Sequence, residues 1–278
     1  DPEALPTPNG LEAVDRWILD RLAQTIDDVA AGYEDFQFSA ATKTLYAFIW
    51  NEFCDWYLEA IKARLYGDDV ASKRAASETA LFVIERTLGL LHPMCPFVTE
   101  ELWSFLPARS GLLAWSEFPT TEGIPRDASA ATTVAAVIQA VTGVRRLRQD
   151  AELSPRAELV ATITGDADAV RGESALLAAL GAIRLVETAA AGPAVPLPAG
   201  AATLHIQGDG LAGKLRDRLA KRREEALAEH KKAEAKLGNA KFVERAPAEV
   251  VEEERERSER FARDAAELEA QLAALDAG

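Results

Sequence analysis

The last third of the chain has apolar residues at the spacing of a helical coiled coil. In residues 251–275 the seam positions alternate three and four residues apart, which is the heptad pattern of two packed helices. These positions are Val251, Glu254, Ser258, Phe261, Ala265, Leu268, Leu272 and Leu275. The preceding segment keeps a thinner stripe, interrupted by Arg222 and His230, at Leu215, Leu219, Ala226, Ala233 and Leu237. The two stripes predict an antiparallel hairpin over residues 210–278.

The residues between the two stripes are typical of a bend. Gly238 and Asn239 suit a left-handed helix C-cap, and Pro247 takes the first-turn position of a new helix. Phe242 and Val243 are the bulky apolar residues between these signals. We therefore expect them to pack at the tip of the hairpin.

The first 155 residues follow helical spacing with intervening breakers. Apolar stripes predict five helices over residues 11–31, 39–65, 70–91, 97–106 and 127–149. Residues 1–10 are proline-rich and read as a linker. Since each helix has one apolar face, the segment 1–155 is predicted to be an all-α bundle.

The pattern changes between residues 156 and 209. Strands are expected at 159–164, 183–187 and 202–206, with a helix over 167–180 between the first two. The predicted fold is therefore mainly α: a helical bundle at 1–155, a small α/β module at 156–209 and an antiparallel coiled-coil hairpin at 210–278.

Composition adds the expected environment. The 278 residues are 48% hydrophobic, which is enough for a sizeable core. Cys54 and Cys95 lie among large apolar residues, which favours buried thiols in a reducing compartment. No apolar run has membrane-spanning length, and no signal peptide opens the sequence. We expect a soluble, cytoplasmic protein without a membrane partner.

The charge is unevenly distributed. The formal net charge of −14 argues against a nucleic-acid partner, yet residues 211–245 carry eleven Lys/Arg against six Asp/Glu. Residues 246–278 carry four against ten. One arm of the hairpin is thus basic and the other acidic. The basic arm can pair with the acidic one, bind phosphates, or divide its residues between both.

Two groups of cations are candidates for RNA binding. Three arginines end the fifth predicted helix of an otherwise acidic bundle: Arg145, Arg146 and Arg148. The second group belongs to the basic arm and its bend: Lys214, Arg216, Arg218, Lys221, Arg222, Arg223, Lys231, Lys232, Lys236, Lys241 and Arg245. Arginine and lysine side chains on such an arm suit contacts with backbone phosphates.

Three stretches resemble a known family. The run from Lys236 to Arg257, KLGNAKFVERAPAEVVEEERER, is similar to the hinge of the C-terminal arm of bacterial valyl-tRNA synthetases. IWNEFCDWYLE from Ile49 and LHPMCPFVTEELW from Leu91 resemble signatures of the anticodon-binding domain that the valine, isoleucine and leucine enzymes share. The aromatic residues of the last two stretches, which we expect mainly in the core, are Trp50, Phe53, Trp56, Tyr57, Phe97 and Trp103.

The resemblance implies a C-terminal region that binds tRNA, most simply tRNA(Val), as a monomer. Aminoacylation and editing, with ATP and Mg²⁺, would then belong to upstream domains of the same polypeptide. The start at Asp1-Pro2 instead of methionine is in keeping with a fragment. Two alternatives stay open: the equivalent region of a leucine or isoleucine enzyme, and a coiled-coil scaffold without enzymatic function.

Other chemistry finds little support in the sequence. Residues 208–213 match G-x-G-x-x-G, but the following helix leads into the hairpin without the return strand that a dinucleotide site needs. A hinge is the better interpretation. His92, His205 and His230 are too scattered for a metal site, and His92 before Pro93 suits a helix end. The HIGH and KMSKS signatures are missing, so we expect no cofactor and no catalytic residue in this chain.

Overall fold

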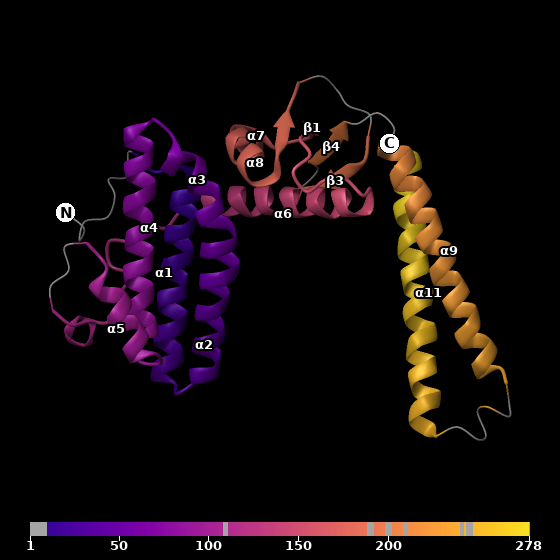
Figure 1. Cartoon of the computed structure of the whole chain (residues 1–278), viewed down its shortest axis with the longest axis horizontal. Helices are drawn as coiled ribbons and strands as arrows, with labels where there is room; N and C mark the ends of the chain where they lie inside the picture. The colour runs from indigo at the N-terminus through magenta and orange to yellow at the C-terminus, as the bar shows by residue number, and fades with distance from the viewer. Residues whose placement is uncertain are drawn as a thin grey trace. The chain divides into compact units, whose positions relative to one another are not determined.

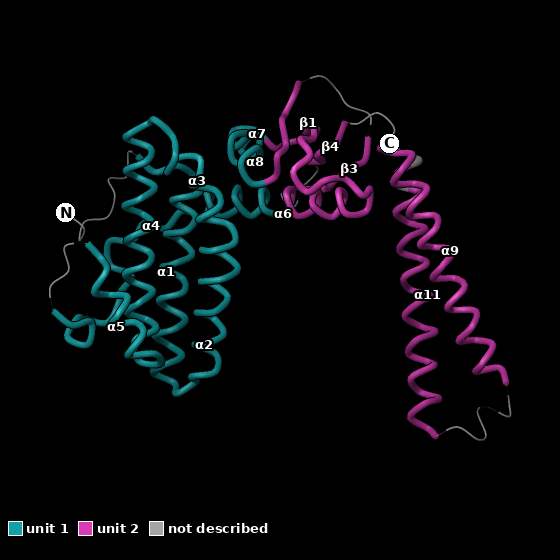
Figure 2. The backbone as a smooth tube through the Cα atoms, in the orientation of Figure 1, with its two compact units in different colours: residues 1–139, 168–180 teal, residues 140–167, 181–278 magenta. Residues whose placement is uncertain are grey.

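A computed structural model describes residues 10–107, 111–187, 192–197, 202–207, 211–239, 242 and 247–277. The chain forms two compact units (Figure 2). Unit 1 comprises residues 1–139 and 168–180, and unit 2 comprises residues 140–167 and 181–278. The predicted division at 155/156 and 209/210 stays a prediction.

Unit 1 is a helical bundle (Figure 1). Its core includes the apolar face of α1, where Ile18, Leu19 and Leu22 are fully buried. Asp69 begins α4 by accepting hydrogen bonds from the backbone N–H groups of Ala71 and Ser72. The elements are α1 (Ala13–Glu34), α2 (Phe38–Tyr46), η2 (Ala47–Tyr57), α3 (Leu58–Tyr66), α4 (Val70–Leu91), α5 (Pro96–Ser104) and η3 (Leu113–Trp115), with the first half of α6 (Ala128–Asp150), α7 (Asp168–Gly172) and most of α8 (Ser174–Gly181).

The second predicted helix contains a π-helical segment. The segments α2, η2 and α3 follow one another without a break, and η2 is a π-helix of 11 residues. Its buried residues Phe48 and Phe53 are five positions apart, so the buried face departs from α-helical spacing. Trp50 is consequently 53% exposed, and its predicted core position is wrong. Phe53 and Tyr57 are buried as predicted.

The α5 region also corrects two predictions. Thr99 and Trp103, four residues apart, are buried on α5, and Thr99 Oγ1 lies 2.8 Å from His92 Nδ1 at the C-cap of α4. Because that face is the buried one, Phe97 is 91% exposed, contrary to its predicted core position. Cys95 is exposed as well, whereas Cys54 is half-buried, so the prediction of two buried thiols is wrong.

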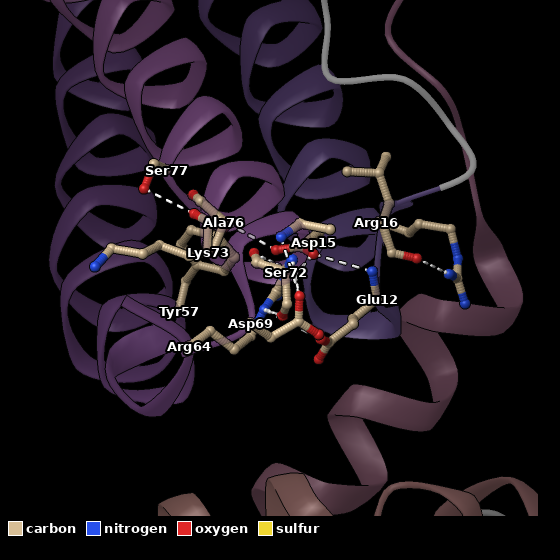
Figure 3. Close-up of polar contacts among 12 residues, drawn as sticks. Glu12, Asp15, Arg16, Tyr57, Arg64, Asp69, Ser72, Lys73, Ala76 and Ser77 are labelled. Carbon is tan, nitrogen blue, oxygen red and sulfur yellow. Dashed lines mark hydrogen bonds and ion pairs between the residues drawn. The ribbon is translucent and has the colours of Figure 1, made fainter. Parts of the chain in front are cut away.

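A buried polar cluster joins α1, η2, α3 and α4 (Figure 3). The carboxylate of Asp15 has no exposed surface and accepts hydrogen bonds from Tyr57 OH at 2.9 Å and Arg64 Nη1 at 2.8 Å. Arg64 also donates to the Ser72 side chain at 2.8 Å. Burial and the neighbouring Asp15 carboxylate raise the pKa of Tyr57 well above its usual value. The buried charges of Asp15 and Arg64 compensate each other, and the hydrogen bonds of the cluster link the four helical segments.

Unit 2 contains a four-stranded mixed sheet with the order β2-β1-β4-β3. The strands are β1 (Leu159–Thr164), β2 (Ile183–Leu185), β3 (Ala194–Pro196) and β4 (Thr203–Gln207). β1 is parallel to β2 and antiparallel to β4, with Ala161 opposite Leu185 and Ile206. The three predicted strands are present, but β3 lies in a stretch predicted as a loop.

The hairpin consists of α9 (Leu211–Leu237) and α11 (Ala248–Ala277), which lie side by side (Figure 1). Leu215, Leu219 and Ala233 of α9 and Ala265 and Leu268 of α11 are buried, as their seam positions predict. The predicted fold class, mainly α with a small α/β part and a helical hairpin, is confirmed. Within the described residues no helix is long and apolar enough to cross a membrane.

Candidate nucleic-acid interface

The seam of the hairpin fixes which side chains of α9 face outward. Buried positions recur at Leu211, Leu215, Leu219, Ala226 and Ala233, so the residues between them lie on the remaining faces of the helix. His230 continues the seam as a polar contact: its Nδ1 lies 3.0 Å from both the backbone oxygen and Oγ of Ser258 on α11. The cations of α9 thereby point away from the apolar contact.

Three arginines of α9 are used in ion pairs within unit 2. Arg218 Nη1 lies 2.5 Å from Glu152, and Arg222 Nη1 lies 2.9 Å from Asp150 at the end of α6. Arg223 pairs with Glu269 of α11 at 3.3 Å. The predicted pairing between basic and acidic arms therefore accounts for Arg223, whereas two other arginines bind the end of α6 instead.

Lys232 and Lys236 are also paired. Lys232 Nζ lies 2.6 Å from Glu229 on its own helix, and Lys236 Nζ lies 2.5 Å from Glu254 on α11. Arg257 of α11 reaches Glu229 at 2.6 Å. Hydrogen bonds from Lys232 and Arg257 lower the pKa of Glu229. These residues form a mixed-charge network between the arms.

Three lysines of α9 differ from these neighbours. Lys214, Lys221 and Lys231 are exposed, and none has a hydrogen bond or ion pair to another residue in the described parts of the chain. Arg216 is exposed as well. Lys241 and Arg245, the remaining candidates of this group, lie outside the described residues. Among the described residues of the predicted basic set, the structure thus distinguishes cations held in ion pairs, which include Lys232 and Lys236, from the three uncompensated lysines.

The arginines at the end of α6 have different environments. Arg148 is 3% exposed and donates to the backbone oxygens of Ala157 at 2.9 Å, Gly181 at 2.6 Å and Ala182 at 3.2 Å. Burial, together with nearby Arg145, lowers its pKa. Because its guanidinium is buried and its donors are used by backbone oxygens, Arg148 stabilises the fold and does not fit the RNA contact predicted for it.

Arg145 and Arg146 are exposed and belong, like Arg148, to unit 2. Arg146 lies 4.0 Å from Glu267 and, with Arg222, borders a cavity of about 490 Å³ between α6 and the hairpin. Four carboxylates, those of Glu225, Glu229, Asp264 and Glu267, line the same cavity. Because these four carboxylates outnumber the two arginines, the cavity is unsuitable for phosphate. The outer face of α9 is therefore the better anion-binding surface.

Sequence reasoning missed the acids that compensate the arginines. Asp150 and Glu152 follow directly after the arginine-rich end of α6, but they pair with Arg222 and Arg218 of α9, so no local charge pattern in the sequence indicated them. In the described residues no three His, Cys, Asp or Glu side chains are grouped as metal ligands. Residues 208–210 of the glycine motif lie outside the described part, and Gly213 lies on α9.

Two family models match the chain. The model described as "Anticodon-binding domain of tRNA ligase" matches residues 15–163, which is more than half of the sequence. The chain belongs to this family. A second model, "Valyl tRNA synthetase tRNA binding arm", matches residues 213–276 and so covers most of α9 and α11. Both predicted resemblances are confirmed, and the uncompensated lysines lie within the arm.

Curated relatives extend the similarity over the whole chain. The valine–tRNA ligase of Desulfotalea psychrophila is 34% identical over 98% of this chain and 31% of its own length. The corresponding values are 35%, 99% and 31% for the Nocardia farcinica enzyme and 37%, 99% and 29% for that of Agrobacterium fabrum. The chain thus spans about three tenths of the length of these relatives.

Proposed function

We propose that this chain is the tRNA-recognising region of a valine–tRNA ligase and that α9 binds tRNA(Val) through backbone phosphates. The match to a tRNA-binding arm supports the ligand class. The observation that carries the residue assignment is the set of uncompensated, exposed lysines Lys214, Lys221 and Lys231. Phosphates would provide the opposite charge that these side chains lack within the chain.

The distribution of paired and unpaired cations supports a non-specific holding role for the arm. Arg218 and Arg222 bind the acids at the end of α6, so they stabilise the root of the hairpin. The lysines alternate with them along the helix and are available for a ligand. Point charges on flexible stems suit phosphate contacts, which position an RNA but do not read its sequence.

Specificity for tRNA(Val) would come from the anticodon-binding bundle. The aminoacylation and editing reactions, with ATP and Mg²⁺, belong in this proposal to other domains of the same polypeptide. We further propose a cytoplasmic monomer. Residues 1–278 alone should therefore bind tRNA without supporting valine-dependent ATP–pyrophosphate exchange.

The test is to replace Lys214, Lys221 and Lys231 with glutamine and to measure tRNA(Val) affinity over a range of salt concentrations. Each phosphate contact contributes a salt slope of about 0.7 to 0.9, so the triple variant should lose about two to about three units of slope. Binding to other tRNAs should weaken by a similar factor, because phosphates are common to all of them.

A charge-matched control is available in unit 1. Replacing Lys62, Lys73 and Arg74 of α3 and α4 with glutamine changes the net charge equally, and all three are exposed. This control should retain the original slope. An arm variant that binds tRNA as tightly and with the same slope as the unaltered chain would contradict the lysine assignment. Failure of the unaltered chain to bind any tRNA would favour the protein-scaffold alternative.

A further inference from the structure

Two large aromatic side chains lie exposed beside each other on the α2–η2 helix of unit 1. Tyr46, the last residue of α2, is 61% exposed, and Trp50 of η2 is 53% exposed. Their ring centroids are 6.3 Å apart with an interplanar angle of 48°. Isolated exposed apolar residues are ordinary, but a contacting aromatic pair offers a surface with a defined chemistry.

The π-helical segment explains why this pair is outside the core. Phe48, Phe53 and Tyr57 carry the buried face of η2, at spacings of five and four residues. The step of five residues from Phe48 to Phe53 is one longer than the longest step along an α-helical face. Trp50 therefore lies outside the face of η2 that packs on the bundle. π-Helical geometry is rare, and the short π-bulges in which it mostly occurs are often found at functional sites.

The charged residues nearby favour an RNA ligand. Lys43 precedes Tyr46 by three positions, which places it on the neighbouring helix surface, and it is exposed without a partner among the described residues. Glu52 is compensated, because Arg21 donates two hydrogen bonds to it at 2.7 and 3.0 Å. Asp55 is the exposed acid of this stretch. Aromatic faces beside a free cation bind unpaired bases and the adjoining phosphate.

We propose that Tyr46 and Trp50 form a stacking platform for an unpaired base of the bound tRNA, with Lys43 binding the adjacent phosphate. The platform lies within residues 15–163, the part matched by the anticodon-binding domain model. This inference rests on the proposed tRNA function and deepens it by assigning where unpaired bases are held. The platform is independent of the lysines of α9, which belong to unit 2.

The experiment uses residues 1–278 and two RNA probes: a hairpin carrying the anticodon loop of tRNA(Val), and a blunt duplex of its stem sequence. Tyr46→Ala and Trp50→Ala should each weaken binding of the hairpin by about 5-fold to about 100-fold, the range for one lost base–aromatic stack. Duplex binding should not change. Trp50→Phe, which retains a ring, should restore much of the hairpin affinity.

Trp115→Ala is the matched control, because Trp115 is 85% exposed on η3 of the same unit. It should leave hairpin binding unaltered. The platform would be overturned if Tyr46→Ala and Trp50→Ala bind the hairpin as tightly as the unaltered chain and keep its melting temperature. That result would leave tRNA binding by the arm intact and would favour a protein-contact role for the aromatic pair. If the unaltered chain binds neither full tRNA nor the hairpin, the proposed function and the platform fail together.

Discussion

Asp15 is the fully buried carboxylate of the polar cluster in unit 1. Its carboxylate is removed from solvent, and its stability depends on donors from Tyr57 and Arg64, which come from later segments of the bundle. An ionised group in this position is tolerated because its hydrogen bonds replace those to water. Removing Asp15 leaves Arg64, whose side chain is only 10% exposed, without its buried partner and with one remaining ion pair among the described residues, to Glu12 at 3.1 Å.

We predict that Asp15→Ala lowers the free energy of unfolding of unit 1 by about 3–5 kcal/mol, the usual cost of breaking a buried ion pair from one side. Urea denaturation followed by circular dichroism measures this. Glu59→Ala is the control, because Glu59 pairs with Lys62 at the surface of α3 and should change stability by less than about 1 kcal/mol. Similar losses in both variants would contradict the role given to burial.

Tyr57 provides a pH-dependent test of the same cluster. Its pKa is raised by burial and by Asp15, so the folded protein keeps the phenol protonated to higher pH than the unfolded chain does. The stabilisation is complete below about pH 10, the ordinary tyrosine pKa, and is lost as pH rises above it.

We therefore expect the difference in unfolding free energy between the original chain and Tyr57→Phe to shrink as pH rises above about 10. Denaturation curves for both proteins on each side of that pH measure it. Because phenylalanine cannot ionise, its curve supplies the reference for all other titrating groups. A constant difference across this range would mean that Tyr57 titrates equally in the folded and unfolded states.

At the scale of elements, heptad spacing predicted the hairpin because one period runs through the second arm, while the first arm keeps a thinner stripe interrupted by Arg222 and His230. The α2–η2–α3 helix was harder, since an α-helical period carried across residues 47–57 assigns Trp50 to the core. The short strand β3 contains only Ala194, Val195 and Pro196, and its pairing with β4 depends on tertiary contacts. Local periodicity is informative only where the local geometry stays regular.

The candidate site shows a different limit of sequence reasoning. The basic character of α9 is readable directly, but a cation's availability depends on acids that are distant in the chain. Arg222 pairs with Asp150, which lies 72 positions earlier. Lys221, its neighbour in sequence, has no such partner among the described residues. Composition therefore identified the basic helix without separating its paired cations from Lys214, Lys221 and Lys231, which have no partner among the described residues.

Glu229 gives the hairpin a pH-dependent element. Hydrogen bonds from Lys232 and Arg257 lower its pKa, so these contacts stabilise the hairpin above the ordinary glutamate pKa. This stabilisation is lost as pH falls through the lowered pKa of the folded state. We expect Glu229→Gln to reduce the melting temperature near neutral pH and to have less effect below about pH 4.

The measurement is thermal unfolding followed by helical circular dichroism at neutral and acidic pH. Glu256→Gln is the control, because Glu256 is exposed on α11 and has no partner among the described residues. It should have a small effect at either pH. An equal effect of Glu229→Gln at both pH values would exclude a contribution from the charged form of this carboxylate.

At the scale of the whole molecule, the chain passes between the two units at 139/140, 167/168 and 180/181, and the first of these points lies within α6. Its residues up to Gln139 belong to unit 1, and those from Ala140 belong to unit 2. Each unit has its own buried charged group: Asp15 in unit 1, and in unit 2 Arg148, whose guanidinium donates to backbone oxygens of Ala157, Gly181 and Ala182. The two groups therefore allow each unit to be destabilised separately.

We predict two unfolding transitions for the chain, each sensitive to one of these groups. Arg148→Met keeps an apolar stem but removes the donors to the carbonyl groups, which should cost unit 2 more than about 2 kcal/mol. Asp15→Ala should lower the other transition instead. Scanning calorimetry of the original chain and both variants tests this, since separate shifts require separate cooperative units. If both substitutions move one shared transition by similar amounts, α6 couples the units into a single cooperative body.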